Sequence, residues 1–176
     1  MTALAEILQA RGLRVTGSDT EERFYTDAIL RKLGIPYFEG FAAEHVDPEG
    51  DCVVYSVAYD PEAHPELRAA RAAGLPMITY PQALGLLSRQ SDFSGICGVH
   101  GKTTTTAMAG TLLDALSVPA TVLVGSGVPG FGGRSTLTRG EAYFVAETDE
   151  YRRNFLQYSP DRIVPVSYTH LTLPTN

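Results

Sequence analysis

The hydrophobic and polar positions of the first half alternate between helical and extended periods. Leucine and isoleucine recur at helical spacing between residues 4 and 8 and predict a first helix that stops at Arg11-Gly12. A short extended run at Leu13 to Thr16 follows, and Gly17-Ser18-Asp19 is typical of a turn that closes it. The chain is therefore predicted to open with a helix, a strand and a turn.

The same alternation continues to about residue 79. One helix is predicted from about Glu21 to Leu33, ended by Gly34, and another from Pro65 to Ala73, ended by Gly74. Short strands are predicted at three places: Tyr37-Phe38, Cys52 to Ser56 and Met77 to Thr79. Because short strands alternate with helices, the pattern predicts a Rossmann-like parallel sheet with helices on its faces.

A polar stretch from Ser88 to Ser94 separates this half from a second one, and we place a domain boundary there. A helix is predicted at Lys102 to Leu116, and Gly125 to Gly133 is too rich in glycine to be anything but a loop. Strands are predicted at three further segments: Phe93 to Cys97, Ala120 to Val124 and Ala142 to Ala146.

Composition and charge exclude several classes of protein. Fourteen basic and twenty acidic residues give a net charge of -6, and no stripe of lysine or arginine suits nucleic acid. No run approaches the roughly 18 apolar residues of a membrane span, and Met1 to Ala10 lacks the layout of a signal peptide. We expect a cytoplasmic protein with neither nucleic acid nor membrane as partner.

Cys52 and Cys97 are predicted to be free, buried thiols.

The strongest chemical signal is the glycine-rich segment Gly95 to Thr106, between a predicted strand and a predicted helix. Gly98 and Gly101 allow a tight turn whose backbone N–H groups point at phosphate oxygens, and the helix N-terminus adds positive potential. Lys102 can then reach the β- and γ-phosphates of ATP, and the Thr103 hydroxyl suits Mg²⁺. The alternative without a ligand is a purely structural strand-to-helix turn with a solvated lysine, and it does not explain the complete Gly-Lys-Thr ending.

An acidic triplet, Glu147, Asp149 and Glu150, follows the last predicted strand. Its carboxylates are expected at the carboxyl edge of the sheet, where ligands of such sheets bind. Mg²⁺ prefers oxygen ligands, so a carboxylate here can join Thr103 in holding the ion. Taken alone, such a triplet is more often a solvated loop.

These motifs together resemble the Mur ligase family. The glycine-rich segment is similar to the family's phosphate loop, whose first glycine lies seven residues before the lysine, as Gly95 does. The acidic triplet, followed by Asn154-Phe155-Leu156, resembles the family's acidic motif. Val15 to Asp19 and Tyr55 to Ala58 are similar to strand ends that lie near the uridine nucleotide.

The resemblance implies a fold and a set of site residues. It implies an α/β protein, with a truncated Rossmann-like UDP-sugar-binding domain at residues 1–90 and the start of a P-loop ATP-binding domain at residues 91–165. Lys102 and Glu147 are implied to be catalytic, and Thr103 and Glu147 to hold Mg²⁺. The implied ATP contacts are Gly98, Val99, His100, Gly101, Lys102, Thr103 and Thr104. The implied UDP-sugar contacts are Ser18, Asp19 and Ser56, although Asp19 could instead cap the next helix.

Three departures from the family pattern qualify the resemblance. Val99 stands where the family usually has threonine, which leaves the backbone cradle intact. The strand and glycine loop that hold the UDP diphosphate in the family are expected to precede Met1. Residues 166–176 match nothing in the family, so we interpret them as a non-native tail and do not offer His170 as catalytic. His45 and His64 are expected to be surface residues.

The activity implied for a complete enzyme is ATP-dependent amide formation through an acyl phosphate. ATP and Mg²⁺ would activate the carboxylate of UDP-N-acetylmuramate, and L-alanine would supply the amine. Two alternatives stay open: the branch that recycles murein tripeptide, favoured by Gly127 to Gly132, and a non-catalytic P-loop module that switches with ATP. We expect no ligase activity from this chain by itself.

Overall fold

The computed structural model describes residues 1–148 and 151–167. Its contacts divide the chain into two units, Met1–Leu84 and Gly85–Asn176. The division falls within α4 (Tyr80–Ser88), a helix that the hydrophobic pattern did not predict. Pro81 and Gly85 interrupt the pattern there, although proline is well tolerated in the first turn of a helix.

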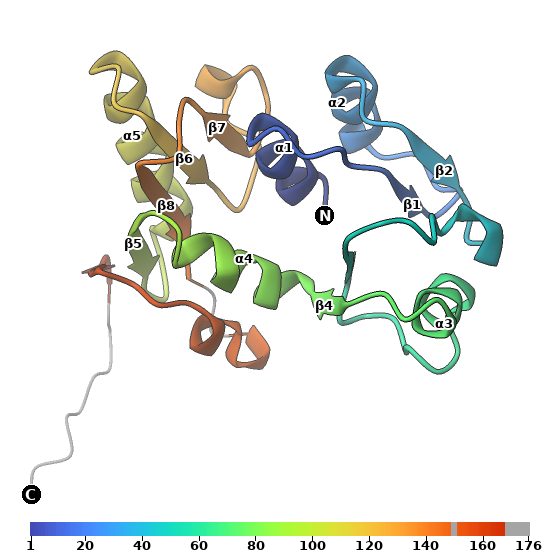
Figure 1. The fold of residues 1–176 in the computed structure, drawn as a ribbon. Coiled ribbons are helices and arrows are strands. Elements are labelled where there is room, and N and C mark those ends of the chain that lie inside the picture. Colours follow the sequence, from blue (N-terminus) through green and yellow to red (C-terminus); the bar gives the residue numbers. More distant parts are fainter. Residues whose placement is uncertain (149–150, 168–176) are drawn as a thin grey trace, which may run out of the picture. The chain divides into compact units, whose positions relative to one another are not determined.

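The first unit contains two separate parallel strand pairs, and helices follow the strands in sequence (Figure 1). Strand β1 pairs with β2, and β3 pairs with β4. The elements in chain order are α1 (Thr2–Ala10), β1 (Gly17–Asp19), α2 (Tyr25–Leu33), β2 (Tyr37–Glu39), the 3-10 helix η1 (Ala43–His45), β3 (Val53–Tyr55), α3 (Pro65–Ala72) and β4 (Met77–Thr79).

The start of this unit corrects two predictions. The first strand is Gly17–Asp19, where a turn was predicted, and residues 13–16 form no regular element. The strand is fixed by its pairing with Tyr37–Glu39, a long-range contact that local hydrophobicity does not report. Helix α2 begins at Tyr25 rather than Glu21, because the Asp27 carboxylate accepts a 3.0 Å hydrogen bond from the Phe24 amide and caps the helix there.

The second unit is built on one five-stranded sheet in the order β7-β6-β8-β5-β9. Every pairing is parallel except that of β6 with β7, a strand the sequence pattern did not predict. The elements are β5 (Asp92–Cys97), α5 (Lys102–Ala115), β6 (Ala120–Leu123), the 3-10 helix η2 (Pro129–Phe131), β7 (Thr136–Thr138), β8 (Tyr143–Glu147), the 3-10 helix η3 (Tyr151–Gln157) and β9 (Arg162–Pro165). The prediction of an α/β protein with parallel sheets and flanking helices is confirmed.

The core of the second unit lies between the sheet and α5. Its buried side chains come from the central strands, among them Ile96, Val122 and Val145, and from Phe131 in the glycine-rich loop. Both cysteines are free, as predicted, but neither is buried: Cys52 is exposed and Cys97 is half-buried. Cys52 directly precedes β3 and Cys97 is the last residue of β5, so both thiols lie at strand ends, where solvent reaches them.

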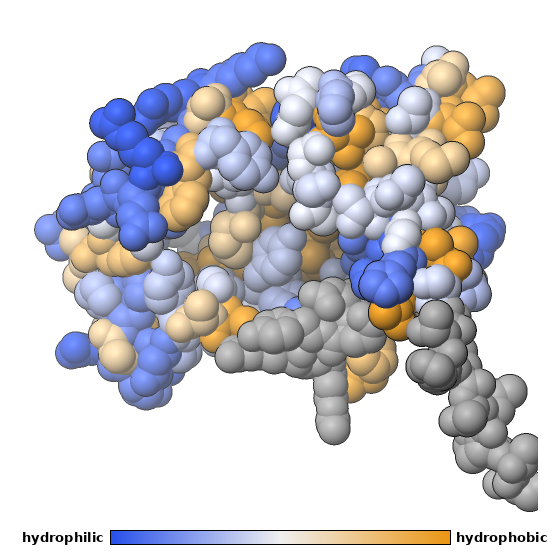
Figure 2. All heavy atoms as spheres, turned by 180° about the vertical axis from the view of Figure 1, so that it is seen from behind, coloured by the Kyte–Doolittle hydropathy of each residue, from blue (hydrophilic) through white to orange (hydrophobic). Residues whose placement is uncertain are grey.

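Helix α5 also carries large apolar side chains on its exposed side. Met108, Leu112 and the C-cap residue Leu116 recur every four residues and are 62%, 62% and 72% exposed. Figure 2 shows hydrophobic residues reaching the molecular surface between polar ones on the face it displays. The buried side of the helix instead presents the small residues Thr106 and Gly110, so polarity alone does not indicate which side of α5 packs on the sheet.

Candidate phosphate-binding site

The glycine-rich segment turns sharply between the end of β5 and the first residue of α5, as the sequence predicted. Gly98 and Gly101 have φ angles of +137° and +83°, in the left-handed region that favours glycine. Gly101 is the N-cap of α5, a helix of 14 residues whose first turn lacks internal partners for its N–H groups. The turn and the helix end therefore bring together backbone donors of the kind that binds phosphate.

The Lys102 side chain folds back over this turn. Its Nζ donates to the Gly98 carbonyl oxygen over 2.6 Å. The Thr106 hydroxyl donates to the Lys102 carbonyl oxygen over 2.8 Å and is fully buried, which ties the first turn of α5 to the lysine. The ammonium group thus lies against the backbone of the glycine turn, where it can neutralise an anion held by the amides.

Thr103 and Glu147, the two predicted Mg²⁺ ligands, are in direct contact. The Thr103 Oγ1 donates to Glu147 Oε2 over 3.1 Å, and the Gly125 amide donates to Glu147 Oε1 over 2.6 Å. The strands explain the meeting, because β5 and β8 are parallel neighbours with Ile96 opposite Glu147. Both oxygen-bearing side chains consequently leave the same carboxyl edge of the sheet.

Thr103 and Glu147 suit a hard cation that takes its remaining oxygen ligands from water and phosphate. Among residues 1–148 and 151–167, no group of three His, Cys, Asp or Glu side chains could hold a metal. Mg²⁺ does not need such a cage, since it commonly takes one or two protein oxygens and completes its shell with water and phosphate. Asp149 and Glu150, which completed the predicted acidic triplet, lie outside the described residues.

The segment after β9 contacts the outer part of the loop. The Val99 amide donates to the Ser167 carbonyl oxygen over 3.1 Å, and the His100 amide donates to Ser167 Oγ over 3.0 Å. An added Cβ at Gly98 would lie 2.9 Å from the Ser167 backbone. Two of the seven predicted ATP contacts therefore have their amides engaged by this chain, while Thr104 is exposed. His170 lies outside the described residues.

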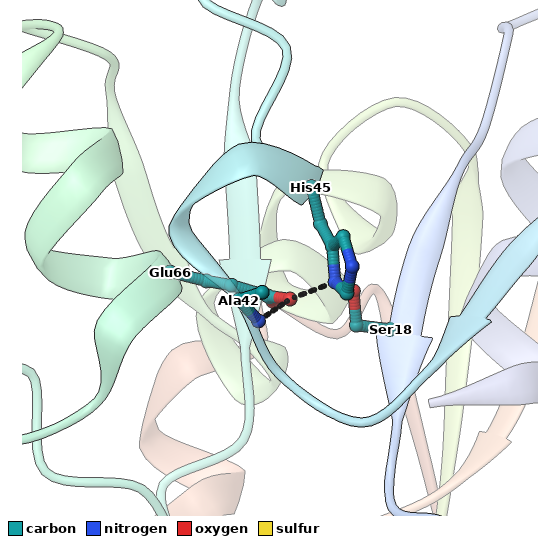
Figure 3. A network of polar contacts seen from close by, with 4 residues as sticks. All are labelled: Ser18, Ala42, His45 and Glu66. Atoms are coloured by element: carbon teal, nitrogen blue, oxygen red, sulfur yellow. Dashed lines mark hydrogen bonds and ion pairs between the residues drawn. The ribbon is translucent and has the colours of Figure 1, made fainter.

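In the first unit, Ser18 and Asp19 are the last two residues of β1. Ser18 lies beside a histidine and glutamate pair (Figure 3). Glu66 Oε1 accepts hydrogen bonds from His45 Nδ1 over 3.0 Å and from the Ala42 amide over 3.3 Å. Ser18 Oγ lies 3.5 Å from the same His45 nitrogen. Because Nδ1 gives its proton to the nearer Glu66, the Ser18 hydroxyl keeps its own proton for another acceptor.

His45 and His64 correct the expectation of surface histidines. The His45 side chain is only 18% exposed, and its ring stacks on Phe38 at a centroid distance of 4.1 Å. His64 packs against Phe41 and Tyr59. Sequence reasoning missed both because no local pattern links them to their partners. The available signal was the polar Glu66 at the start of a predicted helix.

Ser56 and Tyr59 are two further polar groups of the first unit that bear on the predicted nucleotide-sugar contacts. Ser56, the third predicted UDP-sugar contact, follows β3 on the other strand pair, and its Oγ accepts from the Ala58 amide over 3.2 Å. The pKa of Tyr59 is raised by burial and then by the negative charges of Asp19 and Glu66. Tyr59 and Asp19 are thus within electrostatic reach of each other.

A search of the described residues finds no helix with the length and apolar character needed to span a bilayer.

Comparison with known proteins identifies relatives of the whole chain. The sequence profile of the Mur ligase family, catalytic domain, matches residues 1–92. The chain is 48% identical over 170 residues to the UDP-N-acetylmuramate--L-alanine ligase of Treponema pallidum (strain Nichols), which covers 97% of this chain and 35% of that protein. It is 44% identical over 165 residues to the enzyme of the same name from Desulfitobacterium hafniense (strain Y51), covering 93% and 36%. The chain therefore spans about a third of the length of these curated relatives.

Solved structures show the same fold. The UDP-N-acetylmuramate:L-alanyl-gamma-D-glutamyl-meso-diaminopimelate ligase from Neisseria meningitides aligns with a TM-score of 0.78 at 29% identity, covering 100% of this chain and 60% of that one. A murein peptide ligase from Psychrobacter arcticus 273-4 aligns with a TM-score of 0.80 at 26% identity, covering 93% and 39%.

Proposed function

Because the chain belongs to the Mur ligase family, we propose that it is part of an ATP-dependent ligase that joins L-alanine to UDP-N-acetylmuramate. The observation that carries the proposal is the contact between Thr103 and Glu147 beside the glycine turn of Lys102. A phosphate loop and a carboxylate at one sheet edge suit the transfer of a phosphoryl group with Mg²⁺.

The proposed reaction has two steps. The carboxylate of UDP-N-acetylmuramate attacks the γ-phosphorus of ATP, so an acyl phosphate forms and ADP leaves. The L-alanine amine then attacks the acyl carbon and loses a proton to solvent, an amide bond forms, and inorganic phosphate leaves with the electron pair of the broken C–O bond. When bound, Mg²⁺ would neutralise charge on the transferring phosphoryl group.

The residues of this chain would act mainly by position and charge. The amides of Gly101 to Thr104 would hold the phosphates at the start of α5, and Lys102 would turn from the Gly98 carbonyl towards them. Thr103 and Glu147 would supply oxygen ligands to the metal ion. Preorganised donors of this kind stabilise developing charge without rearrangement during the reaction.

We place the nucleotide-sugar contacts in the first unit. Ser18 and Asp19 lie at the carboxyl end of a parallel strand, the usual position of ligands in open α/β sheets, and Ser56 follows a second such strand. The Ser18 hydroxyl has a proton to donate, and Asp19 can accept hydrogen bonds from a hydroxyl or ring N–H of a ligand.

The proposal is tested by nucleotide binding to the present chain. Titration calorimetry with ATP and Mg²⁺ should show binding that Lys102→Ala weakens by more than about tenfold, because the phosphates lose their cationic partner. Lys32→Ala is the matched control, since Lys32 is the other lysine of the chain and is exposed on α2. Equal affinities for the two variants would contradict the role of the loop.

The tripeptide-recycling reaction is a second candidate, supported by the fold match to two murein peptide ligases. The alanine-adding reaction is favoured because relatives named for it are 48% and 44% identical, against 29% and 26% for those structures. Assays of the full-length ligase with L-alanine and with murein tripeptide, measuring phosphate release, separate the two.

A further inference from the structure

Gly125, the first residue of the glycine-rich loop after β6, contacts the carboxylate that we assign to the metal. Its amide donates to Glu147 Oε1 over 2.6 Å, a short distance typical of a hydrogen bond to a charged acceptor. The other oxygen of the same carboxylate accepts from Thr103. Glu147 is therefore held from both sides, by a side chain of α5 and by the backbone after β6.

The Gly125 donor is itself fixed by the sheet. The preceding residue, Val124, is 2% exposed, and its amide donates to the Ser135 carbonyl oxygen over 2.8 Å. A peptide group anchored on a buried residue cannot turn easily, so it presents its N–H in one direction. The position is also crowded: a Cβ on Gly125 would lie 2.9 Å from Glu147 Oε2 and 3.2 Å from Oε1.

From these contacts we propose that Gly125 is a positioning residue for Glu147, and that glycine is needed there because any side chain displaces the carboxylate. This inference rests on the proposed function. The Gly125 amide retains Oε1, so Oε2 is directed at the position shared with Thr103, where a divalent cation is to be bound. Gly125 acts through Glu147 and touches neither substrate nor metal.

The test compares two alanine substitutions in the same loop. Gly125→Ala places a methyl group against Glu147, whereas Gly130→Ala meets no atom within 4 Å. Neither glycine has a φ angle in the left-handed region, so alanine is sterically compatible with both backbones. The measured quantities are the affinity of the chain for Mn²⁺ in the presence of ATP, by electron paramagnetic resonance, and the affinity for ATP in EDTA.

Gly125→Ala should lower the Mn²⁺ affinity by about tenfold or more, as substitutions behind a metal ligand commonly do. Its ATP affinity in EDTA and its thermal unfolding midpoint should match those of Gly130→Ala. In a Glu147→Ala background the same substitution should cause no additional loss, because the residue it acts through is gone. Equal Mn²⁺ affinity for Gly125→Ala and Gly130→Ala overturns the inference, as does a loss of equal size in the Glu147→Ala background.

A second measurement does not depend on the folding of Gly125→Ala. In the unsubstituted chain, the NMR signal of the Gly125 amide proton should lie downfield, as a short bond to a carboxylate requires, and Glu147→Ala should move it upfield. Glu141→Ala, at an exposed position before β8, should leave it in place. An unmoved signal in Glu147→Ala overturns the inference alone. A chain with no Mn²⁺-dependent ATP binding overturns the proposed function and, with it, this inference.

Discussion

The Thr103 hydroxyl and the Glu147 carboxylate, 44 residues apart in the sequence, are joined by a hydrogen bond of 3.1 Å. Their meeting follows from the sheet: β5 leads into the loop before Thr103, and its parallel neighbour β8 ends at Glu147. A hydroxyl and a carboxylate from distant parts of the sequence thereby form a pair of possible oxygen ligands at the carboxyl edge of the sheet.

Removing the Thr103 hydroxyl should weaken the response of nucleotide binding to metal. Thr103→Val keeps the shape of the side chain but deletes the oxygen, so the gain in ATP affinity on adding Mg²⁺ should fall by about tenfold. Thr111→Val is the control, because Thr111 lies on the same helix with an exposed side chain whose hydroxyl donates to the Ala107 carbonyl oxygen. Calorimetry with and without EDTA measures both. A Mg²⁺ effect equal in the two variants would exclude Thr103 as a ligand.

The sequence predicted best where local chemistry and structure coincide. Strand β4 is Met77–Thr79 as predicted, and helix α5 begins at Lys102 because the glycine turn before it leaves no other start. The glycine turn before α5 was predicted for the same reason, since its residues are contiguous in the sequence. Strand β1 was misplaced because its position depends on pairing with β2, a contact between residues about twenty positions apart.

The candidate site shows the same division. Glu147 was predicted from its place after an apolar strand, but its contact with Gly125 could not be, because it depends on the carboxyl ends of β6 and β8 lying side by side. His45 and Glu66 were missed since they lie 21 residues apart on different elements. Hydrophobic periodicity indicates which face of a helix or strand is buried, but it does not indicate which residues that face contacts.

Phe131 should anchor the glycine-rich loop to the second unit. Its ring is 3% exposed, belongs to the main core cluster, and fills the space beside Gly110, where a Cβ would lie 2.6 Å from the ring. Phe131→Ala should lower the free energy of unfolding by about 3–5 kcal/mol, since it leaves a cavity. Phe155→Ala, at a site 43% exposed, should change it by less than about 1 kcal/mol. Denaturant unfolding of both variants checks this, and similar losses would show that the loop is not anchored by its phenylalanine.

The charge of Asp19 should be measurable through Tyr59. Burial, Asp19 and Glu66 raise the pKa of the Tyr59 phenol above its ordinary value of 10.0. The unfolded chain then loses this proton first as the pH rises, so the contribution of Tyr59 to stability is lost above about pH 10. Asp19→Asn should lower the pKa of Tyr59, because it removes one of the negative charges that disfavour the phenolate.

Spectrophotometric titration of the folded chain, with Tyr59→Phe to assign the signal among the nine tyrosines, measures this pKa. Asp114→Asn, in the second unit, is the control and should leave the titration unchanged. A Tyr59 that titrates identically with and without Asp19 would remove the electrostatic link between the two residues.

Glu66 should stabilise the first unit more than an exposed glutamate does. Its side chain is 14% exposed and accepts hydrogen bonds from His45 and from the Ala42 amide. Glu66→Ala removes the carboxylate that accepts from both donors and should cost about 1–3 kcal/mol of unfolding free energy. Glu62→Ala breaks an ion pair with Arg71 in which the glutamate is 74% exposed, and should cost less than about 1 kcal/mol. Equal costs in chemical denaturation would mean that the network in Figure 3 carries no stability of its own.

The last prediction concerns the amides of Val99 and His100, which donate to Ser167. Backbone donors already engaged within the chain must exchange partners before they can bind phosphate, and each such bond contributes about 1 kcal/mol. A chain that ends at Pro165 should therefore bind ATP more tightly than the full chain, by up to about thirtyfold if both bonds contribute about 1 kcal/mol. A chain that ends at Ser167 keeps both contacts and should bind like the full chain. Calorimetry on the three lengths decides the matter, because equal affinity for the chains ending at Pro165 and Ser167 would show that these two contacts do not compete with the nucleotide.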